Sequence, residues 1–103
     1  MLDPKDLPMD SLRVFCRRWR IKELALFGSA LRDDFGPESD IDFLVTFDPE
    51  AHWSLFDLAH METELKVMLG REVDLVSRRG IERSQNWIRR EEILSAARTL
   101  YAA

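Results

Sequence analysis

The sequence predicts an α/β fold in which a small sheet is covered by helices. Short apolar runs rich in branched and aromatic residues alternate along the chain with longer segments whose apolar residues recur at helical spacing. Glycine and proline separate many of these segments, as is typical of turns. No internal repeat, low-complexity tract or linker divides the 103 residues. We therefore expect residues 1–103 to form a single domain.

The helical segments are identified by apolar periodicity and by capping residues. Ser54 and Asp57 resemble a capping box, and Gly70 is placed to end the helix that follows. We expect helices from about Asp10 to Trp19, over residues 29–35, from the Ser54 cap to about Leu69, and from a Ser84 cap to Leu100.

The strand segments are shorter and more uniformly apolar. We expect strands at residues 24–27, 41–47 and 72–76, with a turn at residues 36–39. Strands and helices then alternate along the whole chain, which is the basis of the α/β prediction.

Composition and charge narrow the class of protein. Hydrophobic residues make up 46% of the chain and charged residues 33%, as in ordinary globular proteins. The net charge of −4 argues against generic binding to a nucleic-acid backbone. Cys16 is the only cysteine, which excludes an intrachain disulfide, and its apolar helical setting predicts a buried thiol. With no signal peptide and no membrane-spanning run visible, we expect a cytoplasmic protein.

The first candidate site feature is the pair Gly28-Ser29, at the end of a predicted strand. Glycine permits a sharp turn and the close approach of a ligand. If Ser29 opens a helix, its hydroxyl and the free N–H groups of the first turn are available to an anion such as a triphosphate.

The second feature is Asp40 and Asp42, two residues apart at the start of a predicted strand. Side chains alternate along a strand, so both carboxylates are expected on one face and Ile41 on the other. Neighbouring carboxylates repel each other, and a cation such as Mg²⁺ relieves that repulsion while also binding substrate phosphates.

Asp74 lies between Val73 and Leu75 in a pattern typical of a buried strand. An unpaired carboxylate buried there would be unfavourable. If this strand neighbours that of Asp42, all three carboxylates reach one centre, where two metal ions ~4 Å apart could support in-line phosphoryl transfer. Asp74 is also a candidate base for an acceptor hydroxyl.

Gly28-Ser29, a ten-residue gap, Asp40-x-Asp42 and the later Asp74 resemble the minimal nucleotidyltransferases of the DNA polymerase β-like superfamily. The resemblance covers the chain from about Leu24 to Val76. It implies a small mixed sheet flanked by helices. It also implies that the three aspartates are catalytic and bind Mg²⁺, two ions in all, and that Gly28 and Ser29 contact the nucleotide.

One position departs from the family pattern. Many relatives carry a basic residue directly after Gly-Ser, whereas this chain has Ala30, with Arg32 two residues further on. Arg32 is therefore a candidate for the missing nucleotide-phosphate contact.

The resemblance further implies an antitoxin paired with a HEPN-type ribonuclease toxin. Such a metal-dependent protein adenylyltransferase transfers AMP from ATP to a tyrosine hydroxyl of the toxin. Homo- or hetero-oligomers are compatible with this arrangement.

Two alternatives stay open at this point. A non-catalytic antitoxin could neutralise its partner by forming a complex, although binding alone gives no reason to hold three carboxylates together. Nucleotidyl transfer to a small molecule such as an aminoglycoside is the other, but no second lobe to hold such an acceptor fits into 103 residues.

Overall fold

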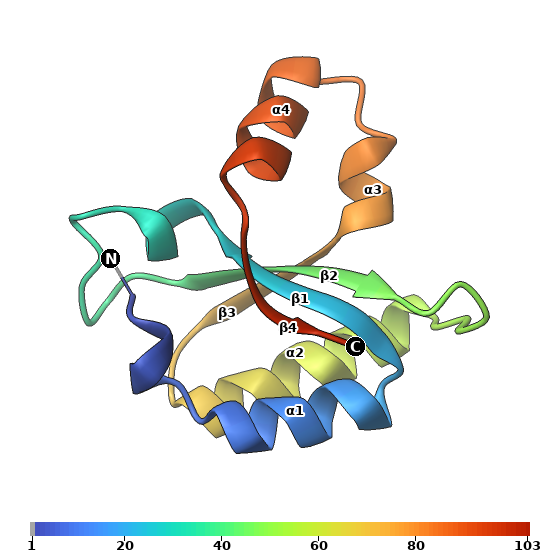
Figure 1. Ribbon diagram of the computed structural model, residues 1–103, viewed down its shortest axis with the longest axis horizontal. Coiled ribbons are helices and arrows are strands. Elements are labelled where there is room, and N and C mark those ends of the chain that lie inside the picture. Colours follow the sequence, from blue (N-terminus) through green and yellow to red (C-terminus); the bar gives the residue numbers. More distant parts are fainter. Residues whose placement is uncertain (1) are drawn as a thin grey trace.

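The computed structural model describes residues 2–103, which form a four-stranded mixed sheet with helices on both faces (Figure 1). The strands are β1 (Ile21–Phe27), β2 (Ile41–Phe47), β3 (Val73–Ser77) and β4 (Arg98–Ala102). Their order in the sheet is β3-β2-β1-β4. Strand β1 is antiparallel to β2 and β4, whereas β2 and β3 are parallel. The predicted α/β fold with a small mixed sheet is confirmed.

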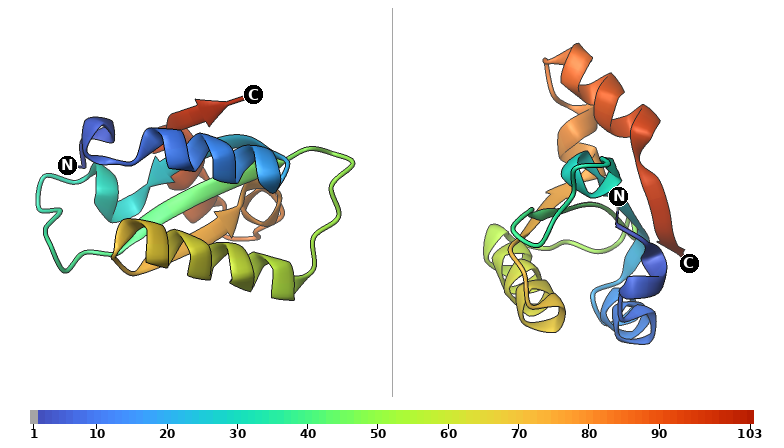
Figure 2. Two further views of the ribbon diagram at one scale, coloured as in Figure 1. Left: turned by 90° about the horizontal axis from the view of Figure 1, so that it is seen from below. Right: turned by 90° about the vertical axis from the view of Figure 1, so that its left-hand side faces the viewer.

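Helical elements precede β1 and lie in each connection between consecutive strands. They are the 3₁₀ turns η1 (Pro4–Asp6) and η2 (Gly28–Leu31) and the α-helices α1 (Met9–Arg18), α2 (Leu55–Leu69), α3 (Arg78–Glu82) and α4 (Trp87–Ala96). Helices α1 and α2 lie side by side under one face of the sheet, and α3 and α4 lie on the opposite face (Figures 1 and 2). No helix in residues 2–103 is long and apolar enough to cross a membrane.

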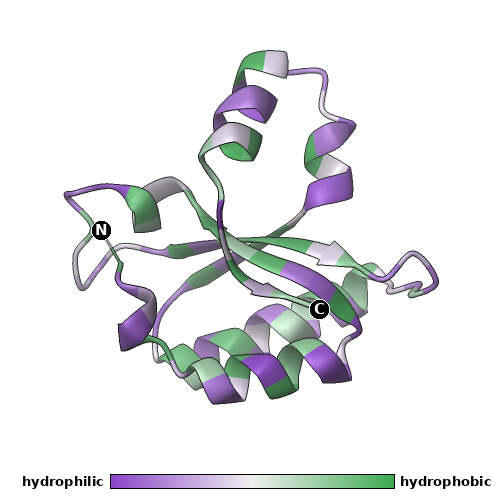
Figure 3. Ribbon diagram, viewed as in Figure 1, coloured by the Kyte–Doolittle hydropathy of each residue, from purple (hydrophilic) through white to green (hydrophobic). Residues whose placement is uncertain are grey.

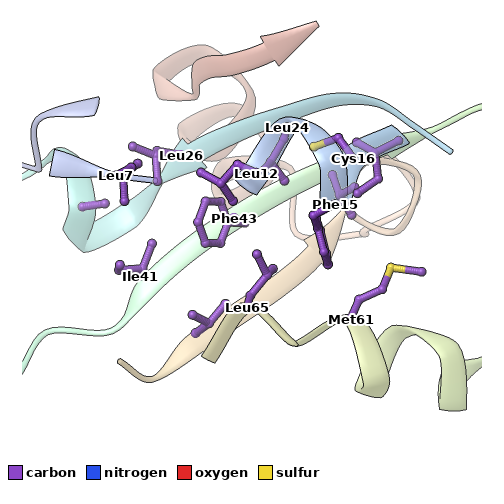
Figure 4. Packing of buried hydrophobic residues seen from close by; sticks show 14 residues of the cluster. Leu7, Leu12, Phe15, Cys16, Leu24, Leu26, Ile41, Phe43, Met61 and Leu65 are labelled. Carbon is purple, nitrogen blue, oxygen red and sulfur yellow. The ribbon is translucent and has the colours of Figure 1, made fainter. Parts of the chain in front are cut away.

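The main core lies between the sheet and the α1–α2 layer. Along β2, Ile41, Phe43 and Val45 point into this core and are almost completely buried, as the period of two in a strand requires. They meet residues of the two helices that include Leu12, Phe15, Met61 and Leu65 (Figure 4). Each such side chain contributes about 1.5–3 kcal/mol on burial, so this layer dominates the stability of the fold. Polar residues cover much of the outer sides of both helices (Figure 3).

A smaller cluster lies on the opposite face. Its buried members are Ala25, Phe27, Leu44, Ile81 and Ile93. These residues come from β1, β2, α3 and α4, so the two short helices are held over the sheet by few apolar contacts. The face that carries Asp42 therefore has much less helical cover than the face below it.

The prediction for α2 is confirmed. Ser54 and Asp57 form the expected capping box: the Ser54 hydroxyl accepts from the Asp57 N–H at 3.2 Å, and the Asp57 carboxylate accepts from the Ser54 N–H at 2.8 Å. Gly70 ends the helix in the left-handed conformation, with φ of 65°.

Three local predictions are wrong at their boundaries. Helix α1 begins at Met9 and makes no side-chain cap, because Asp10 lies inside its first turn. Strand β1 begins at Ile21, before the apolar run that starts at Leu24. The helix expected over residues 29–35 is only the 3₁₀ turn η2, which ends at Leu31.

The prediction of a helix up to Leu100 is wrong, because the last residues form a strand. Asn86, not Ser84, caps α4, accepting from the Arg89 N–H at 3.1 Å. The helix ends at Ala96, and Arg98–Ala102 form β4 instead of a further helical turn. Pairing with β1, in which Leu24 lies opposite Tyr101, overrides the local helical pattern.

Candidate active site

Gly28 follows the last residue of β1 and packs directly against Asp42. Its φ is 65°, a left-handed conformation that glycine adopts without steric cost. A Cβ at this position would overlap Oδ2 of Asp42 and lie 3.3 Å from its Cγ. Glycine is thus required both by the turn and by the space that the Asp42 carboxylate occupies.

Ser29 ties the turn to the start of β2. Its hydroxyl donates to the backbone oxygen of Asp40 at 2.8 Å. Its backbone N–H forms a hydrogen bond that favours the ionised carboxylate of Asp42. Because η2 is a single short 3₁₀ turn, it offers an anion its free N–H groups but only a small helix dipole.

Asp42 and Asp74 are partner residues on the parallel strands β2 and β3. Partner side chains in a parallel pair project from the same face, and neighbouring strands lie roughly 4.7–4.9 Å apart. Phe27 is the partner of Asp42 on its other side. The three strands therefore bring the Gly28 turn and these two carboxylates together at one end of the sheet.

Burial is the main cause that raises the pKa of Asp42 above its ordinary value of 3.8. The hydrogen bond from the Ser29 backbone lowers this pKa, and the nearby charges of Asp74 and Asp40 raise it. Asp42 is thus a half-buried carboxylate within the field of two others. A positive charge at this point would favour its ionised form.

Asp40 lies one residue before β2, and its side chain is exposed. Asp74 is exposed as well, so the buried setting expected from its apolar neighbours is wrong. The reason is that Asp74 lies on the face of the sheet opposite the main core, at the edge strand β3. Val73 and Leu75 point into the main core, while Asp74 faces the sparsely covered side.

Arg32 does not occupy the site in this structure. Its Nη2 lies 3.1 Å from Oδ2 of Asp34, and both side chains are exposed. The prediction that it contacts a nucleotide phosphate stays a prediction.

Arg71 is a residue that the sequence analysis missed. Its Nη2 donates to the backbone oxygens of Gly36 and Ser39, in the loop that leads to Asp40. Its guanidinium also lies over the Phe35 ring, 4.4 Å from the centroid. No motif marks this arginine, because its acceptors are backbone oxygens more than thirty residues away in the sequence.

Comparison with known proteins identifies the family. The model of the nucleotidyltransferase domain family matches residues 9–100, which include every residue of the site described above. The chain belongs to this nucleotidyltransferase family.

Curated relatives agree with that assignment. One is a candidate protein adenylyltransferase of Methanocaldococcus jannaschii, 31% identical over 77 residues, covering 75% of this chain and 77% of the relative. Another is the protein adenylyltransferase MntA of Thermococcus cleftensis, 35% identical over 65 residues, covering 63% of this chain and 64% of the relative.

Solved structures share the fold. A candidate minimal nucleotidyltransferase aligns with a TM-score of 0.66 at 31% identity, over 86% of this chain and 85% of its own. A toxin–antitoxin structure with AMP-PNP gives a TM-score of 0.72 at 20% identity, over 94% and 75% of the two chains. A complex of a tri-AMPylated Shewanella oneidensis HEPN toxin with its MNT antitoxin gives a TM-score of 0.64 at 18% identity, over 92% of this chain and 70% of the other. At 20% and 18% identity, the last two likenesses show a shared fold and nothing more.

The donor set of this nucleotidyltransferase domain suits a hard cation. Asp40, Asp42 and Asp74 offer only carboxylate oxygens, the ligands that Mg²⁺ prefers. Burial is the main cause of the raised pKa of Asp42, and repulsion from Asp74 and Asp40 adds a smaller contribution. Across residues 2–103, however, no three acidic, histidine or cysteine side chains are gathered closely enough to form a metal-binding group as they stand. Binding a cation would require exposed Asp40 and Asp74 to turn toward Asp42.

Proposed function

We propose that this domain is a metal-dependent protein adenylyltransferase that transfers AMP from ATP to a tyrosine hydroxyl on a HEPN-type toxin. It thereby acts as the antitoxin. The observation that carries the proposal is the pairing of Asp42 with Asp74 beside the Gly28 turn, in a chain of the nucleotidyltransferase family. The protein acceptor is supported by relatives named as protein adenylyltransferases.

In this proposal Gly28 and Ser29 bind the triphosphate. Gly28 has no side chain to obstruct its approach. The Ser29 hydroxyl, which now donates to Asp40, turns to a phosphate oxygen. Arg32 is the proposed further phosphate contact and must first leave Asp34.

Asp40, Asp42 and Asp74 would hold the metal ions. When bound, two Mg²⁺ ions would offset the charge that develops on the attacking and leaving oxygens. The acceptor oxygen forms a bond to the α-phosphorus, the bond from that phosphorus to the bridging oxygen breaks, and pyrophosphate leaves. The hydroxyl proton passes to Asp74, an exposed carboxylate beside Asp42, or to solvent.

The experiment is transfer from ATP labelled at either the α- or the γ-phosphate, with Mg²⁺ and the product of the adjacent gene, which the proposal expects to be the toxin. We expect the α-label on the toxin and no γ-label. Asp42→Asn should abolish labelling, because the amide keeps the shape and loses the charge. Asp10→Asn, an exposed aspartate on α1, is the matched control and should label normally.

Each alternative has its own outcome in the same assay. Neutralisation of the toxin by an Asp40→Asn/Asp42→Asn double variant would favour an antitoxin that acts by binding. Label on a small acceptor such as an aminoglycoside, with none on the toxin, would favour small-molecule transfer.

A further inference from the structure

Arg71 connects the end of α2 to the loop that carries Asp40. It follows Gly70, the left-handed cap of α2, and lies two residues before β3. We infer that Arg71 is a positioning residue: its guanidinium fixes the backbone at Asp40, so that this carboxylate can share a divalent cation with Asp42. The inference rests on the proposed function and adds a residue to it.

The contacts of Arg71 converge on the carbonyl that precedes Asp40. Nη2 donates to the oxygens of both Gly36 and Ser39, the two ends of a tight turn. That turn is also closed internally, since the Ser39 N–H donates to the Gly36 oxygen at 3.0 Å and the Gly36 N–H to the Ser39 hydroxyl at 3.1 Å. Arg71 therefore holds a compact unit and not a loose loop.

Two further hydrogen bonds hold the peptide group that follows Asp40, between Asp40 and Ile41. The Ser29 hydroxyl donates to the Asp40 oxygen at 2.8 Å. The Ile41 N–H donates to the Glu72 oxygen at 3.0 Å. The peptide groups before and after Asp40 are thus both fixed, and the bond from Ile41 to Glu72 still holds the second one when the Ser29 hydroxyl turns to a phosphate. The side chain of Asp40 is exposed. Only the side-chain torsions remain to bring the carboxylate toward Asp42.

The surroundings of Arg71 argue against a role in general stability alone. Within the described residues it forms no ion pair, and its buried Nε makes no hydrogen bond. A buried donor without a partner is unfavourable. An apolar side chain could pack on Phe35 without that penalty, so the hydrogen bonds to the turn are what distinguish arginine here.

Lysine cannot replace this arrangement. The planar guanidinium stacks on the Phe35 ring while donating to two oxygens in the same region. A lysine ammonium is a compact, strongly hydrated charge without a planar face. Arg71→Lys keeps the positive charge but removes the planar group that stacks on Phe35 and donates to two oxygens.

The first test measures Mn²⁺ binding in the presence of α,β-methylene-ATP, in which the bond that would break is blocked. Residues that orient metal ligands typically change metal affinity by about 10–100-fold when replaced, and we expect Arg71→Lys to weaken Mn²⁺ binding by roughly 10-fold. Arg18→Lys is the matched control, because Arg18 also joins two distant elements, α1 and α2, through Glu64. It should leave Mn²⁺ affinity unchanged.

Amide hydrogen exchange provides a readout that needs no metal. Arg71→Lys should speed exchange at Ser39 and Ile41 and leave the α1 amides unchanged. Equal exchange in the wild type and Arg71→Lys would overturn the inference even if the variant were less stable overall.

A double-mutant cycle with Asp40→Asn decides whether Arg71 acts through Asp40. We expect Arg71→Lys to weaken Mn²⁺ binding in the wild type and to have no further effect in the Asp40→Asn background. An equal loss in both backgrounds, or no loss in either, would overturn the inference.

The outcome is separable from that of the proposed function. Unchanged Mn²⁺ affinity in Arg71→Lys with normal AMP transfer would overturn the positioning role alone. Absent AMP transfer with the expected cycle would overturn the proposed function alone.

Discussion

Asp42 and Asp74 occupy partner positions on the parallel strands β2 and β3, so that two carboxylates share one face at one end of the sheet. Strands that support only a fold gain nothing from this pairing, because like charges placed side by side are destabilising. The relationship between these two residues is therefore the structural basis of the proposed metal site.

The first prediction concerns stability without metal. Because the pKa of Asp42 is raised in the folded state, the folded chain binds this proton more strongly than the unfolded chain. Its ionisation thus destabilises the fold progressively as pH rises above the ordinary value of 3.8. We expect Asp42→Asn to raise Tm in EDTA at about pH 7, roughly 4–8 °C for each 1 kcal/mol gained, and the gain to vanish in acid.

Magnesium should reverse the order of the two Tm values, so that the wild type melts above Asp42→Asn. A cation that binds only the folded wild type should raise its Tm with concentration, and should have little effect on Asp42→Asn. A metal-free Asp42→Asn protein that melts below the wild type at neutral pH would contradict the account of Asp42.

The second prediction uses two glycines with the same backbone conformation. Gly28 and Gly70 both have φ of 65°, but a Cβ at Gly70 meets nothing within 4 Å, whereas one at Gly28 meets Asp42. Alanine at either position should cost about 1–2 kcal/mol of stability from backbone strain. Only Gly28→Ala should also reduce AMP transfer per folded molecule, by roughly 100-fold, because it displaces the carboxylate. Equal losses of transfer in the two variants would refute this steric role of Gly28.

The third prediction compares two serines whose hydroxyls serve different purposes. Ser54→Ala removes the cap of α2 and should lower the free energy of unfolding by about 1 kcal/mol without changing transfer. Ser29→Ala removes the hydrogen bond to Asp40 and should reduce transfer. Urea unfolding and the labelling assay, run on both variants, measure the two effects. Normal transfer by Ser29→Ala would exclude the proposed role of its hydroxyl.

The fourth prediction concerns Cys16, which lies fully buried in the main core. Burial raises the pKa of its thiol to about 12. We expect no alkylation of the native protein at neutral pH and rapid alkylation once it unfolds, so that modification reports global opening. Fast alkylation under native conditions, followed by mass spectrometry, would show that the α1–α2 layer opens locally.

Local signals were sufficient for part of the fold. The capping box of Ser54 and Asp57 and the stop at Gly70 predict α2, since all the interactions involved lie within one helix. Strand β2 was predicted at its observed bounds because the segment is rich in branched and aromatic residues and a proline follows soon after.

The errors arise where distant parts of the chain decide the structure. Nothing near Tyr101 shows that it pairs with Leu24, so the C-terminal strand was predicted as helix. Asp74 was expected to be buried because its neighbours are apolar, but which face of β3 is covered depends on where distant helices pack, and the face of Asp74 is sparsely covered. Arg71 was missed because its acceptors are backbone oxygens of a distant loop.

The candidate site itself was predictable to a larger extent. Gly28 and Asp42 were singled out from their residue types, their positions at predicted strand ends and their spacing, and the structure packs them directly against each other. Asp74 lies beside them because β3 neighbours β2 in the sheet. The sequence does not fix this strand order, so the place of Asp74 could be predicted only on the condition that the two strands are neighbours.

The most direct test of the central claim is a crystal structure with Mg²⁺ and α,β-methylene-ATP. We predict the triphosphate against Gly28 and Ser29, with Mg²⁺ bound at about 2.0–2.1 Å to carboxylate oxygens of Asp40, Asp42 and Asp74. A nucleotide bound elsewhere on the domain, or Mg²⁺ without contact to Asp42, would contradict it.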